Sequence, residues 1–293
     1  MRNQNAVWAS ILAFRSLCRM LPHGAALSIG ASLGRMIWRL SGKRAAKARI
    51  RCERALGMDE AEAGEIISGS YEHFGRCLVE FLRLPLISGR LRGMIELRGE
   101  EHLREALRKG RGVIFLSAHI GNWEYGAALM AKMGFPMNAI GAEQRDPRIT
   151  EAIADMRRSV GVNHVGKGLD LKAAVSCLKR GEVLAVLLDQ DARDAGVVSP
   201  CLGYPASTPI GPIKLARKFG APVVPVHIIR KEDGERFLMT IEPPLEGRDG
   251  HPFGEDIQYA ADRCNETISG WILETPKQWM WMYPRWESTL SNG

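Results

Sequence analysis

The sequence predicts an α/β protein in which helices flank a mostly parallel central sheet. From about residue 96 onward, segments with helical periodicity alternate with short apolar segments that are typical of strands. Two of these apolar segments, residues 112–116 and 183–188, lack polar alternation, as expected for strands that are buried on both faces. Such a pattern favours an open sheet whose functional sites lie at the carboxyl ends of its strands.

The N-terminal region is apolar but interrupted. Arginines and a proline break residues 6–40, and the longest stretch without a charged residue, residues 20–34, is shorter than the about 20 residues that span a bilayer core. A compact signal peptide with a small-residue cleavage site is not evident either. We predict two helices, broken at residues 22–24, that lie in a membrane interface. Their predicted anchors are Trp8, Phe14 and Trp38.

Charge is distributed unevenly along the chain. Residues 1–54 contain eleven Lys and Arg and one acid, so they carry +10, whereas the net charge of the whole chain is +7. A basic block beside an apolar segment indicates anionic membrane lipids, whereas a nucleic-acid-binding enzyme would more often spread its cations around the site. We predict a membrane-associating segment over residues 1–54, a catalytic domain over residues 55–293, and no nucleic-acid partner. Two alternatives are an amphipathic helix pair packed on the globular body and a single tilted membrane-spanning helix.

The other elements are predicted in order from their periodicity and end signals. Asp146 and Pro147 mark the start of one helix, and Gly134 marks the end of another. The expected helices are residues 43–54, 100–109, 125–134, 147–160, 171–180, 209–219 and 253–275. The expected strands are residues 112–116, 137–141, 163–165, 183–188, 223–230 and 236–242.

The segment from His119 to Glu124 is the strongest candidate for chemistry. His119 follows the strand at residues 112–116, Asn122 is placed to cap the next helix, and Glu124 falls in that helix's first turn. At such a corner the carboxylate of Glu124 can fold back onto the imidazole. A base oriented by an acid in this way takes a proton from a hydroxyl group. The alternative is a capped turn with a structural histidine.

Two further groups of residues are candidates for the site. Asp189 directly follows the strand at residues 183–188, so it shares the sheet edge with His119; with Asp191 and Asp194 it forms either a polar turn or, less simply, a cation site. Arg157 and Arg158 end the helix at residues 147–160, where they either bind a phosphate-bearing substrate or remain solvated.

Several classes of protein are disfavoured. The six cysteines have no metal-ligand or redox spacing, which indicates packing in a reducing environment. There is no Gly-x-Ser-x-Gly elbow, phosphate loop or HExxH motif. These absences disfavour a serine hydrolase, a nucleotide triphosphatase and a zinc protease.

Over residues 10–286 the chain resembles the lipid A late acyltransferases, within the wider group of glycerolipid and lysophospholipid acyltransferases. The segment from His119 to Glu124, with Gly121 and Asn122 between them, resembles the His-x4-Asp/Glu box of the family. Further resemblances are residues 188–191, 202–208, 222–225 and 276–281. Tyr283-Pro284-Arg285 stands where the family usually has His-Arg-Arg.

The resemblance implies transfer of a fatty acyl chain from a thioester of acyl carrier protein or coenzyme A to a hydroxyl of a lipid. It implies that neither a metal nor a cofactor is needed. His119 would be the general base and Glu124 its orienting acid. Backbone N–H groups at Gly121 and Asn122, or a nearby arginine, would stabilise the oxyanion, and Asp189 with Arg157 or Arg158 would line the site. The acceptor would be a lipid A precursor or related glycolipid, or alternatively a lysophospholipid. The expected location is the cytoplasmic face of the bacterial inner membrane, either peripheral or with one N-terminal membrane helix. There are two competing hypotheses. One is a non-catalytic module that binds the membrane surface, and the other is a soluble thioesterase.

Overall fold

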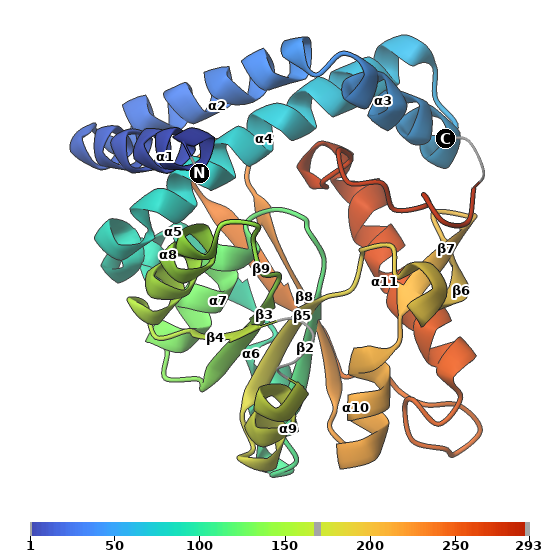
Figure 1. The fold of residues 1–293 in the computed structure, drawn as a ribbon. Coiled ribbons are helices and arrows are strands. Elements are labelled where there is room, and N and C mark those ends of the chain that lie inside the picture. The colour runs from blue at the N-terminus through green and yellow to red at the C-terminus, as the bar shows by residue number, and fades with distance from the viewer. Residues whose placement is uncertain (1, 167–170, 291–293) are drawn as a thin grey trace.

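A computed structural model describes residues 2–166 and 171–290, and within them a mostly parallel sheet with helices on both faces confirms the predicted α/β class (Figure 1). The described part of the sheet has seven strands in the order β1-β9-β8-β2-β5-β3-β4. All neighbours are parallel except β8 and β9. The strands are β1 (Ile95–Arg98), β2 (Val113–Ser117), β3 (Met137–Gly141), β4 (Asn163–Gly166), β5 (Val183–Leu187), β8 (Val223–Arg230) and β9 (Phe237–Ile241).

The helices that connect the strands agree closely with the sequence-based expectations. Asn122 and Asp146 cap α7 and α8 with their side chains, as the sequence predicted. The connecting helices are α5 (Leu91–Met94), α6 (Glu100–Arg108), α7 (Trp123–Lys132), α8 (Pro147–Arg158), α9 (Leu171–Lys179), α10 (Gly211–Phe219) and α11 (Ile257–Glu274). Short 3-10 turns lie at Ser88–Arg90, Arg193–Ala195 and Pro276–Gln278.

The sheet divides the apolar core into two clusters. Ile114 and Leu116 of β2 face one cluster, together with Trp279 and Trp281. Val113 and Phe115 face the other, which α7 also lines. The alternation follows from strand geometry, in which successive side chains point to opposite faces. Because both faces are covered, β2 is buried throughout, as its continuous apolar sequence predicted.

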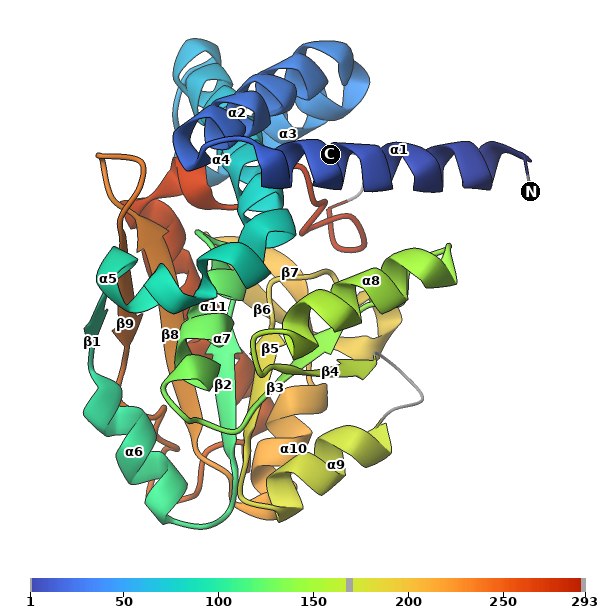
Figure 2. The same ribbon diagram turned by 90° about the vertical axis from the view of Figure 1, so that its left-hand side faces the viewer.

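A layer of four helices lies over the carboxyl edge of the sheet: α1 (Arg2–Met20), α2 (His23–Leu40), α3 (Lys43–Leu56) and α4 (Glu60–Ile87) (Figures 1 and 2). The predicted break at residues 22–24 separates α1 from α2. Arg148 of α8 lies over the Trp8 ring and bonds Asn5, so α1 also reaches the sheet domain. In the described ranges, none of the helices has the length and hydropathy that crossing a membrane requires.

The helices α2 and α4 approach each other closely because glycines meet at their crossing. A Cβ on Gly34 would overlap the carbonyl oxygen of Tyr71, and one on Gly75 would overlap that of Gly30. Side chains at these positions would force the helices apart. The predicted boundary at residues 54/55 falls inside the last turn of α3, and the division into two domains stays a prediction.

Several elements were not expected from the sequence, among them α4, α5, β1 and the two strands β6 and β7. The 28-residue helix α4 lacks a clean amphipathic pattern, because it is covered on several sides. Strand β1 has four residues and lies at the edge of the sheet, so its apolar signal is weak. The segment at residues 196–209 forms an antiparallel hairpin of β6 (Gly196–Cys201) and β7 (Tyr204–Pro209). Thr208 lies in β7 and accepts a hydrogen bond from Arg285.

Candidate active site

His119 and Asp189 meet because their strands are neighbours. Strands β2 and β5 pair in parallel, and Ser117 lies opposite Leu187. His119 and Asp189 each follow two residues later, so the register brings them side by side at the carboxyl edge. Their common position at this edge was predicted, but their direct contact was not.

The Asp189 carboxylate accepts three hydrogen bonds. Oδ1 lies 2.7 Å from Nδ1 of His119, and Oδ2 accepts from the His119 backbone N–H and from the Trp279 indole, both at 2.8 Å. The carboxylate is only 3% exposed. Burial opposes its ionisation, but the charge and hydrogen bonds of His119 and the Trp279 indole lower the pKa of Asp189 below its usual value. An ionised Asp189 holds the proton on Nδ1 and leaves the lone pair on Nε2.

The carboxylate at His119 is therefore not the one that the sequence predicted. Within the described residues no hydrogen bond joins the His119 ring to Glu124. The Glu124 carboxylate instead accepts two hydrogen bonds from Arg157, at 2.6 and 3.1 Å, and one from the Trp123 indole at 3.2 Å. The planar guanidinium matches a carboxylate bidentately, which explains why Glu124 turns toward α8. The predicted role of Glu124 as the orienting acid is thus corrected, and its part in catalysis stays a prediction.

The turn after His119 is shaped by Gly121. Its φ of +58° lies in the left-handed region, and a Cβ there would overlap the carbonyl oxygen of Ile228. The backbone N–H of Gly121 donates to Gln278, and that of Asn122 donates to Ile228. Both N–H groups that the sequence suggested as oxyanion donors are therefore already engaged. The structure assigns them to holding the turn.

Asn122 also contacts a buried ion pair, between Glu80 and Arg230, that the sequence analysis did not predict. Glu80 of α4 is fully buried and accepts two hydrogen bonds of 2.6 Å from Arg230 of β8. It also accepts a hydrogen bond from the Asn122 amide at 2.7 Å, while Asn122 caps α7. A lone acid within an apolar stretch of helix was the available signal, because an acid is seldom fully buried without a partner.

His73 of α4 stabilises the turn at Gly121 through a hydrogen bond. Burial, reinforced by the Arg230 charge, lowers the pKa of His73 to about 3, so its ring is neutral. Its Nε2–H donates to the Gly121 carbonyl at 3.0 Å. The sequence showed no partner for this histidine, since the two residues are 48 positions apart.

The C-terminal aromatic segment closes the other side of the site. The backbone N–H of Met280 donates to the His119 carbonyl at 3.0 Å, and Trp279 binds Asp189. Arg285 is fully buried and bonds Ser207, Thr208 and Asn265, which anchors the segment against β7 and α11. Arg285 belongs to the segment that the resemblance compared with His-Arg-Arg. Its hydrogen bonds connect this segment to β7 and α11.

His119 lines a cavity of about 970 Å³ at the sheet edge. One wall is apolar and comes from α4, through Phe74, Leu78 and Phe81. Glu124 and Arg157 lie in the polar part. A second, narrow cavity of about 40 Å³ shares Trp123, Glu124, Ile140, Arg157 and Leu187 with it and is otherwise mostly apolar.

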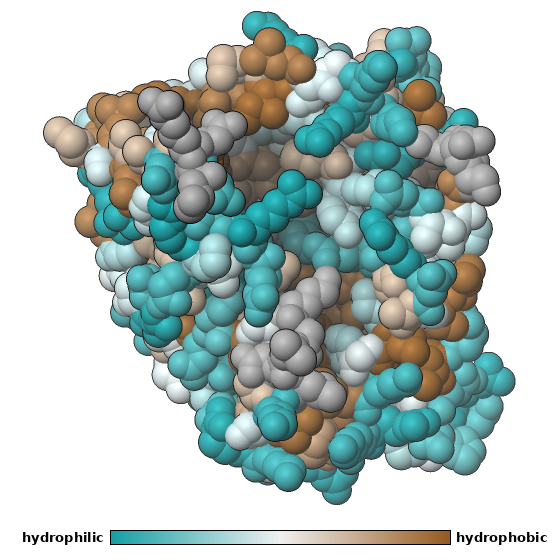
Figure 3. All heavy atoms as spheres, viewed as in Figure 1, coloured by the Kyte–Doolittle hydropathy of each residue, from teal (hydrophilic) through white to brown (hydrophobic). Residues whose placement is uncertain are grey.

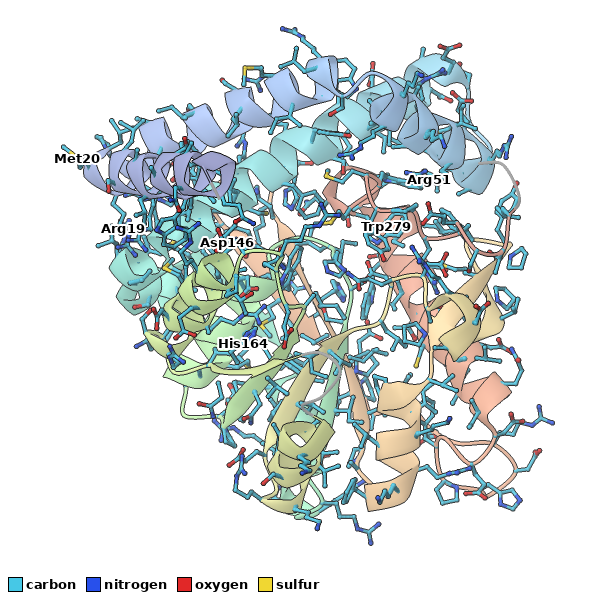
Figure 4. The ribbon with its side chains drawn as sticks, in the orientation of Figure 1. Arg19, Met20, Arg51, Asp146, His164 and Trp279 are labelled. Atoms are coloured by element: carbon cyan, nitrogen blue, oxygen red, sulfur yellow. The ribbon has the colours of Figure 1, made fainter. Side chains whose placement is uncertain are left out.

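Of the two predicted arginines, the structure brings only Arg157 to this cavity. Arg157 contacts Glu124 and also donates a hydrogen bond to Nδ1 of His164 at 2.9 Å (His164 in Figure 4). Burial and the Arg157 charge lower the pKa of His164, which is consistent with a neutral ring that accepts this bond. Arg158 is exposed and pairs with Glu151 and Asp155.

The acidic cluster after β5 shows no sign of a cation site. Asp191 accepts hydrogen bonds from Ser288 and from the Arg193 backbone, so it stabilises a turn. Asp194 is exposed. Over residues 2–166 and 171–290, no cluster of three or more His, Cys, Asp or Glu side chains has the arrangement of a metal site. The six cysteines are free and buried, as expected.

An imidazole with an ionised carboxylate on Nδ1 and a large, partly apolar cavity beside it form a candidate active site. Sequence comparison then assigns the class of reaction: the chain belongs to the bacterial lipid A biosynthesis acyltransferase family, whose family model matches residues 2–288. The protein is therefore an acyltransferase.

Three relatives show the range of the family. The chain is 26% identical to the lipid A biosynthesis lauroyltransferase of Escherichia coli K12, over 92% of this chain and 87% of the relative. It is 25% identical to the palmitoleoyltransferase of the same organism, with the same coverage. It is 24% identical to the phosphatidylinositol mannoside acyltransferase of Mycolicibacterium smegmatis, over 94% of this chain and 90% of the relative.

We expect Asp189→Asn to lower kcat by at least about 10²-fold, the lower end of the usual contribution of a general base. An amide satisfies the two donors at Oδ2 only by placing its NH₂ against Nδ1, and this fixes the tautomer that has no lone pair on Nε2. Steady-state transfer assays measure the effect. Asp194→Asn, which makes the same change in the exposed 3-10 turn at Arg193–Ala195, is the matched control. Full activity of Asp189→Asn would contradict the assignment.

We expect Arg157→Lys to lower the free energy of unfolding by about 1.5–3 kcal/mol, the range for a lost hydrogen bond to a charged group. Lysine cannot bond both oxygens of Glu124 and His164 together. Transfer activity should fall as well. Urea denaturation and activity assays compare this variant with Arg158→Lys, whose exposed ion pairs contribute little. If the two variants had the same free energy of unfolding and the same transfer activity, the bidentate contact of Arg157 would contribute to neither stability nor transfer.

Proposed function

We propose that this acyltransferase transfers a fatty acyl chain from a thioester of acyl carrier protein or coenzyme A to a hydroxyl of a lipid A precursor or a related glycolipid. His119 is the general base in this proposal. The observation on which it rests is the contact of Nδ1 with the buried Asp189 carboxylate, beside a cavity that His119 lines. No hydrogen bond of the described residues uses Nε2, so this nitrogen is available to the acceptor.

The reaction needs one base and no covalent enzyme intermediate. Nε2 removes the proton of the acceptor hydroxyl as its oxygen attacks the thioester carbonyl carbon. The tetrahedral intermediate collapses with cleavage of the C–S bond, and the departing thiolate takes the proton from the imidazolium. The products are the ester and the free thiol. Asp189 stabilises the imidazolium between these two steps.

Arg157 is our candidate for stabilising the oxyanion. The N–H groups of Gly121 and Asn122 are engaged by carbonyl oxygens, which leaves the guanidinium among the groups that the sequence had suggested. Arg157 lies in the cavity, and its pairing with Glu124 fixes its plane. A positioned cation at a developing negative charge is a strong contribution to catalysis. In this proposal Glu124 acts by positioning Arg157.

The acyl chain has a suitable surface in the α4 wall of the cavity and in the narrow apolar cavity that adjoins it. An apolar lining with few polar groups is typical of sites that bind such ligands. The relatives named for lauroyl and palmitoleoyl transfer favour a fatty acyl donor. The chemistry requires neither a metal nor a cofactor.

We infer that the outer faces of α1 and α2 dock on the membrane. Large apolar side chains are exposed on them: Val7, Leu17, Met20, Met36, Ile37 and Leu40. In Figure 3 the region over α1 and α2 is mostly hydrophobic, whereas the region over α3 is mostly hydrophilic. Apolar side chains beside a basic helix are the features of a peripheral interfacial anchor. Both thioester donors are cytosolic, so we propose the cytoplasmic face of the inner membrane.

The three aromatic residues predicted as membrane anchors are less exposed than the apolar side chains on the outer faces of α1 and α2. Trp8, Phe14 and Trp38 are each partly buried, Phe14 against Cys18 and its cluster and Trp38 against the main core. They pack on protein because α1 and α2 lie on α4. The apolar residues on the opposite face are the ones that remain free to enter the bilayer.

Similarity to a phosphatidylinositol mannoside acyltransferase favours glycolipid acceptors beyond lipid A precursors. Mass spectrometry of membrane lipids from cells with and without the protein identifies the acceptor. An acylated lysophospholipid would support the alternative assignment to phospholipid synthesis.

We expect His119→Ala to reduce transfer of a labelled acyl chain by about 10²–10⁴-fold, because the hydroxyl loses its base. Binding to liposomes should be unchanged. His251→Ala, which removes an exposed imidazole, is the control. Undiminished transfer by His119→Ala would refute the base, and release of the acyl group to water without an acceptor would indicate a hydrolase.

We expect Met36→Ser with Leu40→Ser to weaken binding to vesicles that contain anionic lipid by at least about 10-fold, since each buried apolar side chain contributes about 1.5–3 kcal/mol. These residues lie one turn apart on α2, and both are exposed. Flotation assays measure the effect. Val198→Ser on the β6–β7 hairpin removes an equally exposed side chain and should not alter binding. Unchanged flotation of the double variant would exclude this face of α2 as the anchor.

A further inference from the structure

A separate cavity, of about 560 Å³, lies between α3 and the C-terminal segment. Arg44, Lys47, Arg51 and Arg54 line it from α3. Their spacing of three, four and three residues places them on one face of the helix. The cavity thus receives four cations from a single element.

These cations are not occupied by carboxylates of the protein. Over the described ranges, residues 2–166 and 171–290, none of the four forms an ion pair, whereas their neighbour Arg49 pairs with Glu53 and Glu60. The acid that lines the cavity is Glu287, which is exposed and lies 3.8 Å from Arg193. The lining therefore holds four cations and one carboxylate, so its net charge is positive.

Arg51 is the most buried of the four. It points from α3 toward the C-terminal segment, where its Nη2 donates to the Trp281 carbonyl at 3.0 Å (Figure 4). Its Nε is buried and has no hydrogen-bond partner. Burial lowers the pKa of Arg51, which shows that its charge is partly desolvated. An unpaired buried donor is costly, and an oxygen ligand would satisfy it.

The opposite wall of the cavity is mostly apolar. It consists of Met282, Pro284, Trp286 and Leu290, and Ala55 of α3 adds to it. A free inorganic ion would gain no favourable contact from these apolar side chains. A ligand that joins an anion to an apolar body fits both sides.

The same short segment separates this cavity from the catalytic one. Met280 lines the catalytic cavity and bonds the His119 backbone, and Met282, two residues later, lines the basic cavity. A ligand held by α3 is therefore held beside the catalytic centre.

We propose that the cavity between α3 and the C-terminal segment binds the phosphate of the acceptor lipid's headgroup, a subsite separate from the cavity of His119; this deepens the proposed function and rests on it. A phosphate presents up to two negative charges and several acceptor oxygens, which match clustered Arg and Lys side chains. A protein carrier is a poorer match, because the four cations line one cavity together with the apolar side chains of Met282, Pro284 and Trp286.

The first experiment measures binding without turnover. Calorimetry titrates the full-length protein with dihexanoyl phosphatidic acid below its micelle concentration, and separately with inorganic phosphate. We expect Lys47→Gln with Arg54→Gln to raise the Kd for the lipid at least about 5-fold. Lys109→Gln with Lys179→Gln removes the same charge from exposed positions before β2 and β5, at the other edge of the sheet, and should not change it. Equal affinity for inorganic phosphate and the lipid would overturn the headgroup assignment.

The second experiment measures transfer in uncharged detergent micelles with a phosphorylated glycolipid acceptor and its dephosphorylated form. The wild type should show a lower KM for the phosphorylated acceptor. The Lys47→Gln/Arg54→Gln variant should lose that difference with kcat unchanged. An unaltered preference would overturn the subsite, and so would a rise in KM for acyl carrier protein alone. Absence of all transfer by a wild type that still binds the phosphatidic acid would refute the proposed function and retain a lipid-phosphate site.

Discussion

The buried carboxylate of Asp189 is the constraint on which the arrangement of this protein depends. A charge removed from water is tolerated only where donors surround it. Here the donors are the His119 ring, the His119 backbone and the Trp279 indole, so the end of β2, the end of β5 and the C-terminal segment must meet at one point. The same three bonds set the tautomer of the imidazole. Fold and chemistry thus share one electrostatic requirement.

A second buried charge connects the helical layer to the sheet. Glu80 of α4 binds Arg230 of β8 and the amide of Asn122, and Asn122 caps α7 directly after the catalytic turn. Helix α4 in turn supports α2 through contacts that only glycine permits at residue 34. The position of the outer helices is therefore linked mechanically to the turn that holds His119. For the proposed function such a link is useful, because it keeps the proposed docking face and the proposed base in a constant relation.

The helical layer also explains why two cavities of different chemistry lie side by side. Helix α4 supplies an apolar wall to the catalytic cavity, whereas α3 supplies cations to the neighbouring one. The aromatic segment around Trp281 separates the two and contributes to both. The proposed amphiphilic substrate matches this division, since its acyl and anionic parts favour different surroundings.

Much of this could be predicted from the sequence. Periodicity and end signals predicted most of the helices and strands and the break after α1, because these depend on neighbouring residues. The motif around His119 indicated the candidate base, which stays a proposal, and Asn122 indicated the cap, which the structure confirms. The partner of His119 was beyond local reasoning: Glu124 is five residues away and Asp189 is seventy, yet the adjacency of β5 and β2 brings Asp189 into contact. Strand order, and with it the choice between two plausible carboxylates, is decided by packing of the whole sheet, which no local segment encodes.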